Sequence, residues 1–128
     1  MSDKGSTKKV LVVEDDEMIR RSYMDLLRKE GYEVLEASDG RQGLAIALAE
    51  KPDVILLDLL MPEMGGQAML DRLRRDTWGE KAKVIVLTNY DKPRPIFDTL
   101  VHNNAENYLV KANTSMKQLV LYVQLAIG

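Results

Sequence analysis

A short strand-like run recurs five times along the chain, and this repetition constrains the fold more than any other feature. The runs cover residues 10–13, 32–37, 54–57, 84–88 and 106–110 and are rich in Val, Ile and Leu. The first run is apolar throughout, as in strands that are buried on both faces. Segments with helical spacing separate the runs. This alternation predicts an α/β domain whose parallel sheet is covered by helices on both faces.

The boundaries of the predicted helices carry cap and stop signals. The candidate caps are Asp16 for the first helix, Ser38-Asp39 with a return bond from Gln42 for the second, and Asn113, Thr114 or Ser115 for the last. Gly31 and Lys51-Pro52 are expected to end the first two helices. A third helix is predicted around residues 69–73 and a fourth from residue 95 onward. The last helix is predicted to bury Met116, Leu119, Val120 and Val123.

Polar residues gather where the predicted strands end. Strand 10–13 runs into Glu14, Asp15 and Asp16, and strand 54–57 runs into Asp58. The other two chain segments that reach this edge contribute a hydroxyl and an ammonium group, on Thr88 and Lys111. Ligands of parallel α/β sheets bind outside the carboxyl ends of the strands. The sequence therefore predicts a functional site along this rim.

The chemistry of the rim follows from its carboxylates. Two carboxylates about 5 Å apart repel each other by roughly 3 kcal/mol at an effective dielectric constant near 20, so a cation or a proton has to join them. Oxygen ligands without His or Cys select a hard cation such as Mg²⁺ or Mn²⁺. A carboxylate beside such an ion is a suitable nucleophile toward phosphorus. Asp58 is the candidate nucleophile, and Glu14 and Asp15 are the candidate metal holders.

Composition narrows the class of protein. A length of 128 residues suggests one domain, with residues 1–8 as a disordered polar lead-in, natural or artificial. The net charge of −2 is too balanced for a surface that binds nucleic acid or a membrane. The chain has no cysteine, which excludes disulfides and thiolate chemistry and is compatible with a cytoplasmic location.

Four motifs carry a family resemblance. The stretches VLVVEDDEMIRR (10–21), ILLDLLMPEMGG (55–66), VIVLT (84–88) and YLVK (108–111) stand in this order and at this spacing. Together they resemble the receiver domain of two-component response regulators, over residues 9–128. The resemblance implies a CheY-like, flavodoxin-like doubly wound (βα)5 fold, with three layers and a five-stranded parallel sheet of order 2-1-3-4-5.

The resemblance also implies roles for the residues on the rim. Asp58 would be the phosphoacceptor. Its Mg²⁺ ion would be held by Asp15 and Asp58 directly, by the backbone carbonyl of Leu60, and by Glu14 mainly through water. Thr88 would close onto the phosphoryl group with Lys111 as its counter-ion, and Tyr108 would move inward behind Thr88.

Partners follow from the same resemblance. The expected phosphodonor is a sensor histidine kinase or a histidine phosphotransfer protein. Signalling to a target or an output domain, and homodimerisation, would use the helix that starts near residue 95, the strand 106–110 and the last helix. No binding of nucleic acid or membrane is expected from this domain, and separate enzymatic turnover is not expected.

Three positions depart from the family pattern. Ala112 follows Lys111 where the family usually has proline, and a non-proline residue favours a trans bond. Leu60 and Tyr90 are bulky or apolar where many relatives carry polar groups, which predicts slow autodephosphorylation.

Three alternative functions compete with a phosphoacceptor. A haloacid-dehalogenase-like hydrolase would need an Asp-x-Asp motif after the first strand and usually a cap domain. A flavodoxin-like cofactor binder would need a Ser, Thr and Gly phosphate loop there, where EDDEM (14–18) would repel a phosphate. A pseudo-receiver of the same fold, which binds proteins without being phosphorylated, is the nearest alternative.

Overall fold

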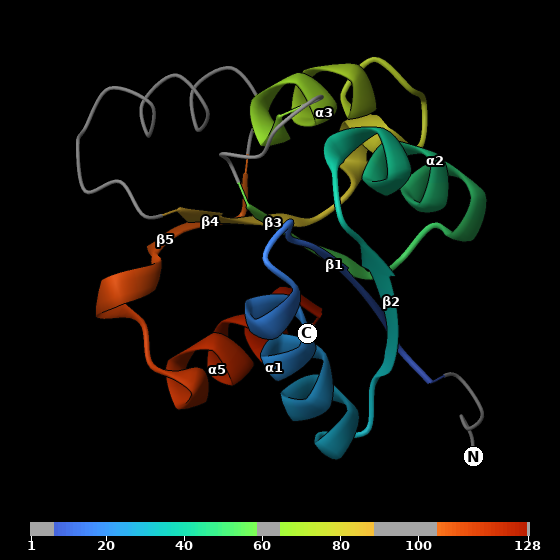
Figure 1. Cartoon of the computed structure of the whole chain (residues 1–128). Coiled ribbons are helices and arrows are strands. Elements are labelled where there is room, and N and C mark those ends of the chain that lie inside the picture. The colour runs from blue at the N-terminus through green and yellow to red at the C-terminus, as the bar shows by residue number, and fades with distance from the viewer. Residues whose placement is uncertain (1–6, 59–64, 89–104, 128) are drawn as a thin grey trace.

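Five parallel strands in the order β2-β1-β3-β4-β5 form the centre of the computed structural model (Figure 1). The structure describes residues 7–58, 65–88 and 105–127. The strands are β1 (Lys9–Val13), β2 (Glu33–Ala37), β3 (Val54–Asp58), β4 (Val84–Thr88) and β5 (Asn107–Val110). The predicted sheet, its parallel pairing and its strand order are confirmed.

Helices cover both faces of this sheet (Figure 1). Figure 1 shows α1 and α5 on one face and α2 and α3 on the other. Their bounds are α1 Glu17–Lys29, α2 Gly40–Glu50, α3 Gly66–Leu73 and α5 Met116–Ile127, with short 3₁₀ helices at η2 Gly79–Lys81 and η3 Lys111–Asn113. The helix predicted from residue 95 lies outside the described residues. Over the part of the chain that the structure describes, no helix is long and apolar enough to cross a bilayer.

The helix caps agree with the sequence signals. The side chain of Asp16 accepts a hydrogen bond from the backbone N–H of Ile19, as an N-cap of α1 should. Asp39 caps α2, and the Gln42 side chain accepts a bond from the Ser38 backbone N–H. Of the three cap candidates for α5, Ser115 makes the capping bonds. Its Oγ accepts a bond from the Gln118 N–H, and its own N–H donates to Oε1 of Gln118.

Two apolar cores lie on opposite faces of the sheet. Alternate residues of β1 and β3 feed them: Val10, Val12, Val54 and Leu56 pack with α1 and α5, and Leu11, Val13, Ile55 and Leu57 pack with α2 and α3. All eight side chains are at most 1% exposed. The two central strands are therefore held from both faces, so that the residues at their ends start from a fixed backbone.

The prediction for the inward face of α5 was right at three positions and wrong at one. Leu119, Val120 and Val123 are buried, but Met116 is 42% exposed. Helical spacing places all four on one face, yet it does not tell at which turn a helix first meets the sheet. In α5 that contact starts one turn after Met116, at Leu119.

Candidate functional site

The pairing of β1 with β3 brings two acidic segments together at the rim. Val13 of β1 lies beside Leu57 of β3 in parallel register. The chain leaves β1 at Glu14, while Asp58 is the last residue of β3. Segments 44 positions apart along the sequence therefore end side by side, as the sequence predicts for parallel strands.

Three carboxylates form one acidic cluster at this place: Glu14, Asp15 and Asp58. One oxygen from each lies within 4.8 Å of the others. Glu14 is 2% exposed and Asp58 is 4% exposed, while Asp15 faces the solvent. Carboxylates this close and this buried repel one another strongly, so the cluster favours a positive charge among its oxygens.

Lys111 supplies a positive charge at the cluster. Lys111 comes directly after β5, whose last residue, Val110, lies beside Thr88 at the end of β4. Its Nζ donates to Oε1 of Glu14 at 2.5 Å and lies 3.6 Å from Oδ2 of Asp58. Burial lowers the pKa of Lys111, but the hydrogen bond to Glu14 and the nearby negative charges outweigh burial and raise it overall. The ammonium group therefore stays charged at neutral pH.

Glu14 is fixed through its backbone as well as its carboxylate. Its N–H donates to the carbonyl of Ala37 at 3.1 Å, and its carbonyl accepts a bond from Nη1 of Arg20 at 2.9 Å. Its Oε2 accepts a bond from the Asp16 N–H at 3.2 Å. The sequence predicted Glu14 as an acidic neighbour of a metal. The direct pair with Lys111 and the contact with Arg20 were missed, because neither follows from spacing along the chain.

Tyr23 is a second residue that sequence reasoning missed. It lies in α1 and is 8% exposed, in the core that α1 and α5 form with the sheet. Burial raises the pKa of its phenol. The charge of Lys111 lowers this pKa, and the charges of Glu14 and Asp58 raise it. Only the fold brings these four residues together.

The remaining predicted site residues are described in part. Thr88 ends β4, and Tyr108 lies in β5 beside Val86, but the structure does not describe their side chains. Leu60 and Tyr90 lie outside the described residues. The described peptide bonds are all trans, including the bond between Lys111 and Ala112, as the sequence predicts.

The donors of the acidic cluster suit a hard divalent cation. All three are carboxylate oxygens, and no His is among the three cluster residues. Mg²⁺ and Mn²⁺ prefer such oxygen ligands and retain water at open positions, which the exposed side of Asp15 allows. In residues 7–58, 65–88 and 105–127, this is the one group of three or more His, Cys, Asp or Glu side chains with this spacing.

The sequence matches a known family over most of its length. Residues 10–124 match the family model of the response regulator receiver domain. The transcriptional regulatory protein PdtaR of Mycobacterium tuberculosis is 32% identical over 128 residues, which cover 99% of this chain and 60% of PdtaR. The chain thus spans about three fifths of the length of that relative.

Solved structures give the same result. The chemotaxis protein CheY4 of Vibrio cholerae is similar with a TM-score of 0.86 and 30% identity, over 94% of this chain and 99% of CheY4. The response regulator TrrA of Thermotoga maritima, solved in complex with Mg²⁺-BeF, is similar with a TM-score of 0.81 and 29% identity. That match covers 94% of this chain and 99% of TrrA.

Proposed function

Because the chain belongs to the family of response regulator receiver domains, we propose that it is a phosphoacceptor in which Asp58 receives a phosphoryl group. The proposed donor is a sensor histidine kinase or a histidine phosphotransfer protein. The observation that carries this proposal is the acidic cluster, whose three oxygens lie within 4.8 Å at the end of the central strands. We propose residues 9–128 as the receiver domain and residues 1–8 as a lead-in.

Asp58 is the proposed nucleophile. One of its carboxylate oxygens forms a bond to phosphorus while the bond between phosphorus and the donor's imidazole nitrogen breaks. The electron pair of the broken bond leaves with the imidazole, which takes a proton from water. The ammonium of Lys111, 3.6 Å from Oδ2 of Asp58, is placed to offset negative charge that gathers on the phosphoryl oxygens.

Glu14, Asp15 and Asp58, with the carbonyl of Leu60, are the proposed holders of Mg²⁺, or of Mn²⁺ in its place. When bound, the ion neutralises charge on the carboxylates and on the incoming phosphoryl group. Glu14 has a second task in this chain, since it also holds Lys111 at 2.5 Å. The residue therefore links the proposed metal site to the proposed counter-ion.

We propose that Thr88 and Tyr108 transmit the change from the phosphorylated Asp58 to the surface of the domain. Thr88 would close onto the phosphoryl group, and Tyr108 would move inward behind it. The change would reach a target or an output domain, or a second copy of the chain, at the surface of β5, α5 and the segment before β5. We propose a cytoplasmic location, where kinases of this kind find ATP.

A pseudo-receiver that never accepts phosphate is the competing function. A pseudo-receiver would not need Glu14 and Asp58 to be 2% and 4% exposed, because burying carboxylates lowers the stability of the folded protein. The pairing of Lys111 with both of them is also more than a protein-binding surface requires. These observations favour phosphorylation.

The test is phosphorylation by a small donor. The protein is incubated with acetyl phosphate and Mg²⁺, and its intact mass is measured over time. The expected result is a gain of one phosphoryl group that is absent without Mg²⁺ and absent in Asp58→Ala. The control variant Asp53→Ala removes a carboxylate from the opposite end of the sheet and should still gain the group. An unchanged mass in the folded wild-type protein would favour the pseudo-receiver.

A further inference from the structure

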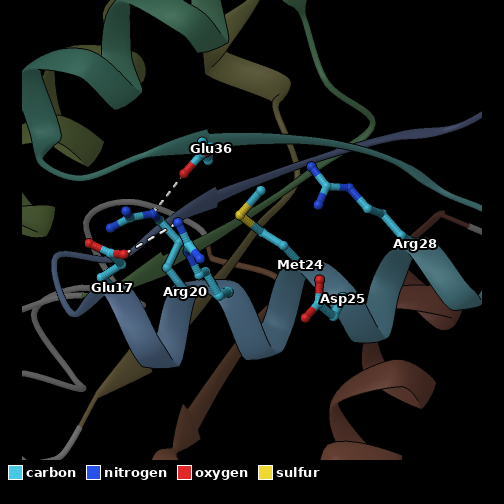
Figure 2. A pocket seen from close by; sticks show the side chains of 7 residues that line it. Glu17, Arg20, Met24, Asp25, Arg28 and Glu36 are labelled. Carbon is cyan, nitrogen blue, oxygen red and sulfur yellow. Dashed lines mark hydrogen bonds and ion pairs between the residues drawn. The ribbon is translucent and has the colours of Figure 1, made fainter.

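Arg20 connects the acidic cluster to the outer edge of the sheet. It lies in the first turns of α1, and its side chain is 12% exposed although it lines a surface pocket (Figure 2). Nη1 donates to the carbonyl of Glu14, and Nε donates to Oε1 of Glu36 on β2, each at 2.9 Å. A single guanidinium thus bridges the end of β1 and the end of β2.

The Glu14 carbonyl stands at a point where the sheet no longer supplies a partner. The strand β1 ends at Val13, and its last register partners are Ala37 and Leu57. The N–H of Glu14 still reaches the carbonyl of Ala37. The donor to its carbonyl is the guanidinium of Arg20. A buried carbonyl needs such a donor, so Arg20 holds the peptide unit that joins Glu14 to Asp15.

This peptide unit is the base from which the metal-holding side chains extend. Glu14 and Asp15 are consecutive, and both provide oxygens to the acidic cluster. We propose that Arg20 is a positioning residue of the receiver site, which sets Glu14 and Asp15 by fixing the Glu14 carbonyl to Glu36. This inference rests on the proposed function, since it assigns a part in metal binding to a residue that touches neither metal nor phosphate.

The guanidinium also carries a charge, and the test has to separate charge from geometry. A positive charge near the cluster repels a divalent cation, so its loss alone would strengthen metal binding. Arg20→Lys keeps the charge but loses the planar fork that reaches two acceptors at once. Weaker metal binding in Arg20→Lys would therefore report on geometry.

Arg21 offers a matched control on the same helix. Its side chain is 71% exposed and pairs with Glu17 at 3.4 Å, in the ordinary i,i+4 arrangement of a surface helix. Arg21→Lys is the same chemical change one residue away, without a contact to the Glu14 carbonyl. It should leave the metal site as it is.

In the first measurement, the unphosphorylated protein is titrated with Mg²⁺, and binding is monitored by the amide shifts in ¹⁵N–¹H spectra. Partners that orient metal ligands change metal affinity by roughly 10- to 100-fold when they are removed, and Arg20 acts through a backbone carbonyl, so about tenfold is expected. The dissociation constant should rise by this factor in Arg20→Lys and stay unchanged in Arg21→Lys. The same spectra show whether each variant is folded.

The second measurement separates binding from chemistry. With acetyl phosphate as donor, the Mg²⁺ concentration for half-maximal rate should rise about tenfold in Arg20→Lys. The rate at saturating Mg²⁺ should stay close to that of the wild type, because Arg20 does not touch the reacting atoms. A general loss of structure would instead lower the rate at every Mg²⁺ concentration.

Each outcome has one meaning. Equal Mg²⁺ dissociation constants in Arg20→Lys and wild type overturn the inference, even if both are phosphorylated. A wild-type protein that binds Mg²⁺ but is never phosphorylated overturns the proposed function and leaves the titration as the test of Arg20. If Arg20→Lys is unfolded, Arg20→Met replaces it. Met lacks the charge, so weaker Mg²⁺ binding there supports the inference and equal or stronger binding overturns it.

Discussion

Replacing Lys111 by methionine should move metal affinity and phosphorylation in opposite directions. The ammonium of Lys111 lies 2.5 Å from an oxygen of Glu14 and 3.6 Å from an oxygen of Asp58. It therefore occupies the neighbourhood in which a divalent cation would have to bind. Methionine has a similar length and no charge, so Lys111→Met removes the repulsion between the ammonium and the cation.

The size of this effect can be worked from the geometry. The oxygens of the acidic cluster lie within 4.8 Å of one another, so we take about 5 Å as the separation of the two positive charges. A single and a double charge at about 5 Å repel by roughly 1.7 kcal/mol at the dielectric constant of water, and by more in a drier site. The value for water is therefore a lower bound, and it corresponds to Mg²⁺ binding that is at least about tenfold tighter in Lys111→Met.

Thermal unfolding with and without Mg²⁺ measures this change. Ligand binding to the folded state stabilises it by RT ln(1 + [L]/Kd), so a tenfold lower Kd adds about 1.4 kcal/mol once Mg²⁺ is in excess. For a domain of this size that is roughly 5 °C of additional Mg²⁺-induced increase in Tm. The rate of phosphorylation by acetyl phosphate should fall by about a hundredfold at saturating Mg²⁺, because a charge aimed at the phosphoryl group is lost.

The control is Lys81→Met, which removes the same charge from an exposed position on η2. It should alter neither the Mg²⁺-induced increase in Tm nor the phosphorylation rate. If Lys111→Met binds Mg²⁺ with unchanged or weaker affinity, the ammonium does not compete with the cation, and the reasoning from these two distances is refuted.

Three further predictions concern stability. Gly43→Ala should lower the free energy of unfolding by about 1–3 kcal/mol, because the Cβ of the new alanine would lie 2.9 Å from Sδ of Met69. An unchanged midpoint of urea unfolding would contradict this close packing of α2. Arg74→Met should cost about 2–3 kcal/mol in the same assay, because the guanidinium donates to two backbone carbonyls between α3 and β4, and a loss below 0.5 kcal/mol would show these bonds to be dispensable. Burial raises the pKa of Tyr23 above 10.0, and the bond to Glu14 with nearby charges raises that of Lys111 above 10.5 although burial lowers it. The folded state therefore holds both protons more tightly, so these two groups should leave stability unchanged below about pH 10 and lower it above that pH. A rise in stability above pH 10 would contradict the sign.

The parts of the fold that depend on local residue types were predictable from the sequence. The caps at Asp16 and Asp39 follow from short polar side chains next to apolar spacing, and both form as predicted. The parallel sheet follows from apolar runs separated by helices, and its strand order from the family resemblance. Met116 shows the limit of such patterns, since its burial depends on where α5 meets the sheet.

The site was predictable in its composition and less so in its contacts. The gathering of Glu14, Asp15 and Asp58 follows from strand ends in a parallel sheet, and the structure has it. The bond between Lys111 and Glu14 joins residues 97 positions apart, and the two bonds of Arg20 cross from α1 to Glu14, just after β1, and to Glu36 on β2. Such contacts depend on side-chain reach between elements, which a pattern along the chain does not encode.

Because the acidic cluster lies where β1 and β3 end side by side, it can form only after these two strands have paired. These strands are neighbours in the sheet, but α1, β2 and α2 lie between them in the chain, so these elements must fold before Asp58 meets Asp15. Lys111 arrives from β5 at the far edge. A nascent chain released before residue 54 thus lacks Asp58, so the acidic cluster, and with it the proposed site for a divalent ion and a phosphoryl group, forms only after β3 has paired with β1.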